Sequence, residues 1–349
     1  MGAPKCTQSE FIELFETHGP AKTAKILKCG IRTVYDRRRG IEARLQRTLN
    51  IPNREMAKSP IVSHPHRIQL DIKNGCVIVG SDLHIWPGPA STAMLAFIKL
   101  CRDMSPAAVI LNGDVMDFPR ISRHPPIGWE NQPTVIAEIE AAQDQLSLVE
   151  KATFKARKIW TLGNHDGRFE TRLATIAPEY AKINGVHLRD HFPNWEPCWS
   201  VFINDNVVVK HRFKSGIHAP HNNTMWAGRT IVTGHLHSQK VQPITDYNGT
   251  RYGVDTGCIA SPDASAFVDY TEDNPKSWRS GFGVLTFVDG QLLPPELVTV
   301  WDSTRVVFRG QLIEVPNEAK KTQAAARPPR SNSSIRRRRK RANHRTRYR

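Results

Sequence analysis

Gly234-His235-Leu236-His237 directly follows the β-branched run Thr230–Thr233. A run of this kind, closed by a turn that carries histidine, predicts a buried strand with metal-ligating side chains at its tip. Four more polar clusters follow apolar runs in the same way: Asp82-Leu83-His84, residues 112–117, Gly163-Asn164-His165-Asp166 and the single residue His211. The sequence therefore predicts that these clusters meet at one edge of one sheet and form a metal site there.

Length and composition allow a sizeable core. The chain has 349 residues, of which 39% are apolar, which is enough for one large domain with additions or for two domains. No run of 18 apolar residues occurs, and the first residues carry no apolar signal core, so we expect neither membrane contact nor secretion. The six cysteines are scattered without a C-x-x-C pair, which is typical of free thiols in a reducing compartment. These features predict a cytoplasmic protein.

Positive charge is concentrated at the two ends of the chain. The net charge is +16 at pH 7, and residues 320–349 alone contain 13 Lys and Arg. Residues 1–48 carry a net charge of +5, whereas residues 49–319 carry −2. Basic ends on a nearly neutral middle are typical of terminal modules that bind a polyanion. We therefore expect nucleic acid, with DNA favoured, as a partner.

The first 48 residues predict a small helical domain. Helical periodicity is interrupted at His18-Gly19-Pro20 and again before Ile31, which predicts three helices. Residues 24–35 resemble a helix-turn-helix unit, although Lys28 stands where such turns usually carry glycine. The core of this unit is expected to contain Ile26, Leu27 and Val34.

The third predicted helix, over residues 31–45, carries a basic stripe. Arginine on such a helix can contact phosphates or guanine edges. The residues expected to point outward and to contact nucleic acid there are Arg32, Thr33, Arg37, Arg38 and Arg39. The alternative interpretation is a helical extension whose basic stripe is only solvated.

The rest of the chain predicts a linker, a layered domain and a tail. Residues 49–72 contain three prolines and predict a linker. From residue 73 to residue 316, strand patterns alternate with amphipathic helical patterns, which predicts an α/β domain. The stretch 119–133 lacks periodicity and predicts a loop near the site. Residues 317–349 predict a disordered basic tail. Its residues expected to contact nucleic acid are Arg336, Arg337, Arg338 and Arg339.

The motif order D-x-H, G-D-x-x-D, G-N-H-D, a lone histidine after a strand, and G-H-x-H resembles the calcineurin-like metallophosphoesterase superfamily. The resemblance covers roughly residues 74–262. It implies a four-layer α/β/β/α sandwich with a dimetal centre at the strand ends. A helix-turn-helix head on such a domain also resembles phage or prophage proteins, which would place the cytoplasm in a bacterium or an infected host cell.

The same resemblance implies two divalent metal ions and their ligands. The first metal would be bound by Asp82, His84 and His237, and the second by Asn164, His211 and His235, with Asp114 as the bridge. Oxygen and nitrogen ligands without a thiolate suit manganese, iron or zinc, and manganese is favoured.

Two further residues take catalytic roles in this resemblance. His165 would face the substrate and protonate the leaving oxygen. Asp117 would orient His165 and keep it charged, which makes the imidazolium a suitable acid near neutral pH. Asp166 is expected to support the turn and not to bind metal.

Three functions fit these features. The pattern favours a phosphodiesterase or nuclease that acts on nucleic acid through metal-activated water. The second is a phosphomonoesterase acting on protein or small molecules, with basic ends that serve only localisation. Phe118 stands where members acting on phosphoprotein often carry arginine. The third is a non-enzymatic nucleic-acid-binding protein with a vestigial site, against which the complete ligand set argues.

Overall fold

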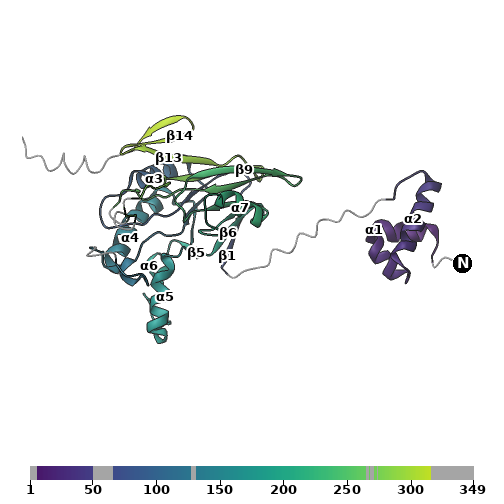
Figure 1. The fold of residues 1–349 in the computed structure, drawn as a ribbon, viewed down its shortest axis with the longest axis horizontal. Helices are drawn as coiled ribbons and strands as arrows, with labels where there is room; N and C mark the ends of the chain where they lie inside the picture. Colours follow the sequence, from purple (N-terminus) through teal and green to yellow (C-terminus); the bar gives the residue numbers. More distant parts are fainter. Residues whose placement is uncertain are drawn as a thin grey trace, which may run out of the picture. The chain divides into compact units, whose positions relative to one another are not determined.

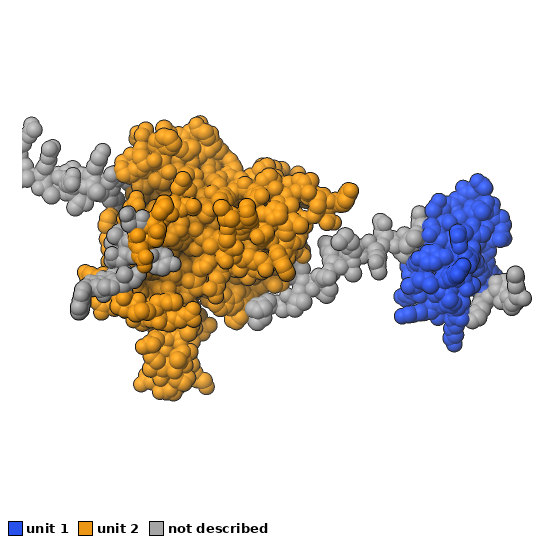
Figure 2. All heavy atoms as spheres, viewed as in Figure 1, with its two compact units in different colours: residues 1–65 blue, residues 66–349 orange. Residues whose placement is uncertain are grey.

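The computed structural model describes residues 6–49, 66–126, 131–264, 267, 271–272 and 274–315. The chain divides into two compact units, residues 1–65 and residues 66–349 (Figure 2). Among the described residues, no helix combines the length and the apolar character needed to cross a membrane. The predicted basic tail, with its four arginines at 336–339, lies outside the described residues.

The first unit is helical, as predicted. Helix α1 (Gln8–Ile26) is interrupted at Gly19, whose φ of 72° is non-helical, and Pro20 follows directly. A capping box at Thr7 begins α1, and α2 (Ile31–Leu45) follows a short turn. The two helices enclose a small core made of Phe11, Phe15, Ala24, Leu27, Val34, Ile41 and Leu49. Ile26 is 46% exposed, so its predicted place in this core was wrong.

Two of the residues expected to face nucleic acid are used inside the first unit instead. The Arg37 guanidinium donates to the backbone carbonyls of residues 6 and 7, at 2.7 and 3.1 Å, and lies over the Phe11 ring. Arg38 pairs with Glu42 at 2.8 Å. The prediction that both point outward was wrong, because their stems and guanidinium groups cover the apolar core. The other three are exposed: Arg32, Thr33 and Arg39.

The second unit contains two sheets within the described residues. The smaller has the strand order β1-β6-β7-β8-β10-β9, with β1 Arg67–Leu70, β6 Ser200–Ile203, β7 Val207–Val209, β8 Thr230–Thr233, β9 Lys240–Asp246 and β10 Gly249–Asp255. The larger has the order β15-β14-β13-β11-β2-β3-β4-β5, with β12 paired to β11. Its strands are β2 Gly75–Gly80, β3 Ala108–Asn112, β4 Arg157–Thr161, β5 Glu196–Cys198, β11 Gly281–Val288, β12 Gln291–Leu292, β13 Glu296–Asp302, β14 Arg305–Phe308 and β15 Gln311–Glu314.

The second unit begins earlier than the sequence predicted. Strand β1 pairs in parallel with β6, in register from Arg67 opposite Ser200 to Leu70 opposite Ile203. The predicted linker through residue 72 was therefore wrong at its end, because four of its residues complete the edge of a sheet. Residues 50–65 of that linker lie outside the described residues.

Helices cover the outer faces of the two sheets (Figure 1). The helices described in the second unit are α3 Thr92–Met104, α4 Val135–Ala152, α5 Asp166–Ile176, α6 Leu188–His191 and α7 Ala219–Ala227, with short 3-10 turns η1 Pro119–Ile121 and η2 Pro178–Tyr180. Helices α3 and α4 lie on the larger sheet, and α7 packs on β8, β9 and β10 of the smaller sheet.

The period of two along each strand sorts side chains between two apolar cores. On β2, Val77 and Val79 enter the core between the sheets, whereas Ile78 enters the core beneath α3 and α4. All three are fully buried. Strands buried on both faces appear as continuous apolar runs, which is why β2, β3 and β4 stand out in the sequence. The predicted four-layer α/β/β/α sandwich is confirmed.

Candidate metal centre

The polar clusters lie at strand ends of both sheets. Strands β2, β3 and β4 are parallel neighbours in the larger sheet, and they lead into the clusters at residues 82–84, 112–117 and 163–166. Strands β7 and β8 are parallel neighbours in the smaller sheet and lead into His211 and residues 234–237. The clusters do meet, as predicted. The prediction of a single sheet was wrong, because the two sheets face each other and deliver their ends to one place.

Glycine permits the close approach of these turns. A Cβ on Gly234 would overlap Ser81 Oγ and Asp82 Oδ2, and a Cβ on Gly163 would overlap Asp114 Oδ1. Each glycine lies in one cluster and is covered by a residue of another. The turns are therefore interlocked, with the carboxylates packed directly on backbone.

Five candidate ligands have a backbone conformation that residues other than glycine rarely adopt. The φ angle is positive at Asp82 (53°), His84 (39°), Asp114 (51°), His235 (70°) and His237 (56°). Left-handed backbone at a residue other than glycine costs free energy and persists only where surrounding contacts enforce it. Five candidate ligands in these turns have left-handed backbone. Contacts with the surrounding structure, and not local backbone preference, therefore set the directions of their side chains.

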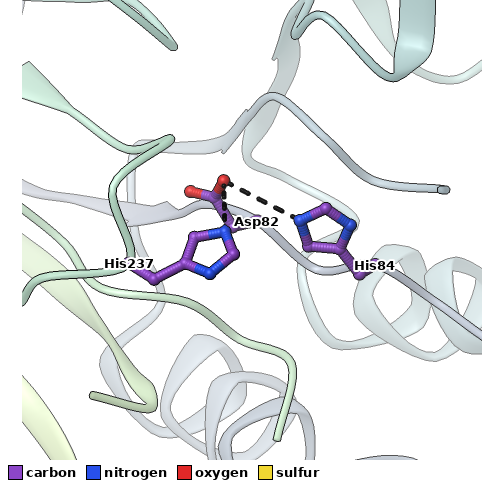
Figure 3. A group of neighbouring side chains, drawn as sticks. All are labelled: Asp82, His84 and His237. Atoms are coloured by element: carbon purple, nitrogen blue, oxygen red, sulfur yellow. Dashed lines mark hydrogen bonds and ion pairs between the residues drawn. The ribbon is translucent and has the colours of Figure 1, made fainter. Parts of the chain in front are cut away.

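The first group of candidate ligands contains Asp82, His84 and His237, shown in Figure 3. The Asp82 carboxylate is fully buried, and its Oδ1 lies 3.1 Å from His237 Nε2 and 3.9 Å from His84 Nε2. The ligand atoms of the three lie within 4.8 Å of one another. One oxygen and two nitrogens converge on one point, as a metal would require.

The second group contains Asp114, His211 and His235. Asp114 Oδ2 lies 3.1 Å from His211 Nε2, while His211 Nδ1 lies 2.8 Å from the backbone carbonyl of residue 112. Because the carbonyl accepts a hydrogen bond from Nδ1, Nε2 is the nitrogen of His211 that can bind a metal. The backbone N–H of His235 donates to Asp82 Oδ2 at 2.8 Å, which joins the second group to the first. Asn164 lines the same cavity as Asp114 and His235.

Asp117 connects a candidate ligand to the candidate acid. Its Oδ1 lies 2.5 Å from His165 Nδ1 and 3.3 Å from His84 Nδ1. The backbone N–H of His165 donates to Asp114 Oδ1 at 2.8 Å. The structure therefore brings together all nine residues for which the sequence analysis predicted metal or catalytic roles.

Charges within the site are strongly coupled. Burial raises the pKa of Asp82, but the charges of His237 and His211 outweigh it and lower the pKa to about 2. Burial likewise raises the pKa of Asp114, and the hydrogen bond and charge of His211 reverse this effect. Burial lowers the pKa of His211, yet Asp82 and Asp114 raise it to about 10. Two buried carboxylates are therefore stable in their ionised form only beside a positive charge.

The residues present fit a pair of divalent cations. The buried atoms His84 Nε2 and Asn164 Oδ1 have no hydrogen-bond partner among the described residues. Buried polar atoms are usually paired, so unpaired lone pairs in a site that contains two buried carboxylates fit the binding of a cation. All donor atoms are oxygen or nitrogen.

The site opens into a cavity of about 500 Å³. His165, Arg168 and Trp278 are among the residues that line this cavity. Trp278 and Phe267 pack against His237, with ring centroids 4.4 and 5.8 Å away. The aromatic rings fix the imidazole in place, a role that the sequence analysis missed because nothing in residues 267–278 marks it.

Two buried carboxylates hold the turns without facing the cavity. Asp166 accepts backbone N–H groups of Asp114, Val115 and Gly163 at 2.8–2.9 Å, so its predicted supporting role is confirmed. Glu138, on α4, accepts the backbone N–H of residues 117 and 118 at 3.1 and 2.8 Å. Sequence reasoning missed Glu138, although an acid on the apolar face of an amphipathic helix is a usable signal.

The model of the calcineurin-like phosphoesterase family matches residues 77–251, and the chain therefore belongs to that family. Among curated relatives, the gene 54 protein of Mycobacterium phage D29 is 26% identical over 243 residues, which covers 64% of this chain and 93% of that protein. The gene 54 protein of Mycobacterium phage L5 is 27% identical over 248 residues, with the same coverage.

Solved structures similar to this chain include two phosphoester-related proteins. A predicted phosphoesterase from Streptococcus pneumoniae is 14% identical, with a TM-score of 0.28, and the match covers 70% of this chain and 94% of that one. A serine/threonine phosphatase from Saccharomyces cerevisiae is 12% identical, with a TM-score of 0.35, and the match covers 68% and 85%. At these TM-scores neither adds to the family assignment, which rests on the matched residues 77–251.

Proposed function

We propose that this phosphoesterase is a dimetal phosphodiesterase that cleaves nucleic acid. The observation that carries the proposal is the pair of adjoining ligand groups, Asp82–His84–His237 and Asp114–His211–His235, joined by the hydrogen bond from His235 to Asp82. Two neighbouring divalent cations lower the pKa of water and neutralise charge on a phosphate in transit. Asp114 would bridge the two metals, and Asn164 would complete the second. Manganese is the favoured metal, with iron or zinc as alternatives.

The chain's own residues would supply the acid and hold the phosphate. His165 would protonate the leaving oxygen through Nε2, because Asp117 occupies Nδ1. Burial lowers the pKa of His165, but the Asp117 hydrogen bond and the charges of Asp114 and Asp117 outweigh it, so the pKa lies above 6.5. Arg168 Nη2 lies 3.2 Å from His165 Nε2, where it would bind a phosphate oxygen beside the acid.

The preference for nucleic acid is supported by the basic ends of the chain. Arg32, Thr33 and Arg39 of the first unit are exposed, and residues 320–349 contain 13 cations. Each phosphate contact made by such cations releases counterions and strengthens binding at low salt. We propose that the first unit and the tail hold DNA while the metallophosphoesterase domain cleaves it.

One assay set tests the proposal. Metal-stripped protein, reloaded with Mn²⁺, would be given plasmid, single-stranded DNA, bis-p-nitrophenyl phosphate and p-nitrophenyl phosphate. We expect cleavage of DNA and of the dye diester. Turnover of the monoester alone would make the chain a phosphomonoesterase. DNA binding without turnover of any substrate would leave only the binding function. Deleting residues 317–349 should weaken DNA affinity and its salt dependence more than turnover of the dye diester.

A further inference from the structure

A second cavity adjoins the metal centre, and most of its lining residues have no role in the site described above. Its volume is about 730 Å³, and it shares His124, Asn164 and Arg168 with the cavity over the metal site. It also reaches His211 of the second ligand group. We call this second cavity the groove. A ligand bound in the groove would therefore lie next to a phosphate held at the second metal.

The groove is lined by cations from three separate segments. They are Arg123, which follows η1, Arg168 and Arg172 on α5, and Lys210 and Arg212, which flank His211. Among the described lining residues none is Asp or Glu. Outside Arg168, none of these cations pairs with a described acid. The groove thus has a high density of positive charge that the neighbouring described residues do not neutralise.

Helix α5 presents two of these cations on one face. Arg168 and Arg172 are four residues apart, a spacing that brings like charges together and destabilises an isolated helix. Figure 1 shows α5 projecting from the body of the second unit, and both arginines lie within the first seven residues of this helix. Like charges in this arrangement are stabilised when an anion with more than one charge lies between them.

One aromatic side chain faces the same groove. Trp199, between β5 and β6, lines it and is 49% exposed, while its backbone N–H donates to the carbonyl of residue 66 at 2.8 Å. An exposed indole beside several guanidinium groups is the combination that binds single-stranded nucleic acid, since the cations follow the phosphates and the ring stacks on a base. Stacking of this kind requires a base that is not paired within a duplex.

We propose that this groove binds a single nucleic-acid strand as it enters the second-metal side of the site. Arg172 and Arg212 would contact its phosphates, and Trp199 would stack on one base. The proposal deepens the proposed nuclease function and rests on it for the bond that is cleaved. The strand's binding can nevertheless be measured without cleavage.

The binding test uses the full chain in EDTA and a fluorescein-labelled oligothymidylate, followed by anisotropy across a salt series. We expect Arg172→Gln/Arg212→Gln to lower affinity about ten-fold and to reduce the salt slope by about 1.4, since each single-strand phosphate contributes about 0.7. Trp199→Ala should lower affinity by about ten-fold as well, and Trp199→Phe should retain most of it.

Matched variants separate the groove from net charge and from misfolding. Lys73→Gln/Arg102→Gln removes two exposed cations located away from the groove, at the β1–β2 turn and the end of α3. The charge-retaining Arg172→Lys/Arg212→Lys should restore most of the affinity. Equal losses in the two glutamine variants would overturn the proposal. The proposal would also be overturned if Trp199→Ala lowered the affinity for a duplex of the same length as much as it lowers the affinity for the single strand. A third contrary result would be a phosphopeptide that displaces the labelled oligonucleotide at the same concentration as unlabelled oligonucleotide does.

A turnover test distinguishes this inference from the proposed function. With Mn²⁺ restored, we expect Arg172→Gln/Arg212→Gln to lower the ratio of kcat/KM for oligonucleotide to kcat/KM for the dye diester about ten-fold, chiefly through KM. A parallel fall for both substrates would place these arginines at the metal centre and overturn the groove. Absence of turnover of any substrate would overturn the nuclease function, while the binding result in EDTA would still decide the groove.

Discussion

The carboxylate of Asp117 lies 2.5 Å from the Nδ1 atom of His165. The same oxygen is 3.3 Å from Nδ1 of His84, so one side chain orients both a candidate metal ligand and the candidate acid. In both rings the carboxylate holds one nitrogen and leaves Nε2 directed at the site. A carboxylate behind a ligating imidazole fixes its tautomer and increases its basicity.

Asp117→Asn should therefore impair two properties at once. We expect kcat for the dye diester to fall by about 100-fold, from loss of acid orientation, and metal affinity to fall about ten-fold. Steady-state kinetics at saturating Mn²⁺ and a separate metal titration would measure the two effects. Asp103→Asn, which removes an exposed acid paired with Lys99, is the control. Full activity in Asp117→Asn would remove it from the mechanism.

Asp114→Asn and His165→Asn should both abolish turnover for different reasons. Asp114 lies in the second ligand group, whereas His165 is predicted to transfer a proton. We expect the Asp114 variant to lose bound metal and the His165 variant to retain it, as measured by elemental analysis after gel filtration. Turnover should fall about 100-fold or more in each. Two metals retained in Asp114→Asn would contradict the bridging role.

Divalent metal should stabilise the fold. Asp82 and Asp114 are both buried, and their negative charges repel each other. A cation that binds only the folded state adds free energy that grows with its concentration, about 2.7 kcal/mol at 100 times Kd. We expect Mn²⁺ to raise the Tm of EDTA-treated protein by several degrees and not to raise that of Asp114→Asn/His235→Asn. An equal shift in both proteins would place the metal elsewhere.

Glu138 should make stability depend on pH. Burial raises its pKa to about 7 in the folded protein, against 4.5 as the usual value. Because the folded pKa is the higher one, this effect favours folding below pH 4.5 and is lost as pH rises through about 7, by up to about 3 kcal/mol. Glu138→Gln keeps an oxygen for the backbone N–H groups of residues 117 and 118 but removes the charge.

Urea unfolding at pH 5 and pH 8 measures this effect. The wild-type protein should lose more stability between these two values than Glu138→Gln does, and the variant should be the more stable protein at pH 8. A parallel pH dependence of the two proteins would show that Glu138 stays ionised in the fold.

Two glycines of the same region should respond oppositely to alanine. A Cβ on Gly234 would overlap Ser81 and Asp82, so Gly234→Ala should lower stability by about 3 kcal/mol and disrupt metal binding. Gly167, in the first turn of α5, has open space around the added Cβ, and Gly167→Ala should be neutral or stabilise by about 0.5–1 kcal/mol. Denaturant unfolding with a metal titration checks both. Equal stability of the two variants would contradict the interlocked turns.

The sequence determined most of the elements and the list of candidate ligands. Buried strands produce apolar runs, and the polar residue types that follow them are directly readable, so Asp82, Asp114 and His235 could be named without coordinates. The break at Gly19 was readable for the same local reason, since glycine and proline act on the backbone where they stand.

Tertiary structure decided which elements share the site and which side chains are free. It placed the ligand turns on two facing sheets and turned Arg37 inward onto Phe11. It also brought Glu138, Phe267 and Trp199 from distant segments to the site and its groove. Periodicity reports only which face of an element is apolar. The pairing of faces depends on packing between residues far apart in the chain, and no local pattern encodes that packing.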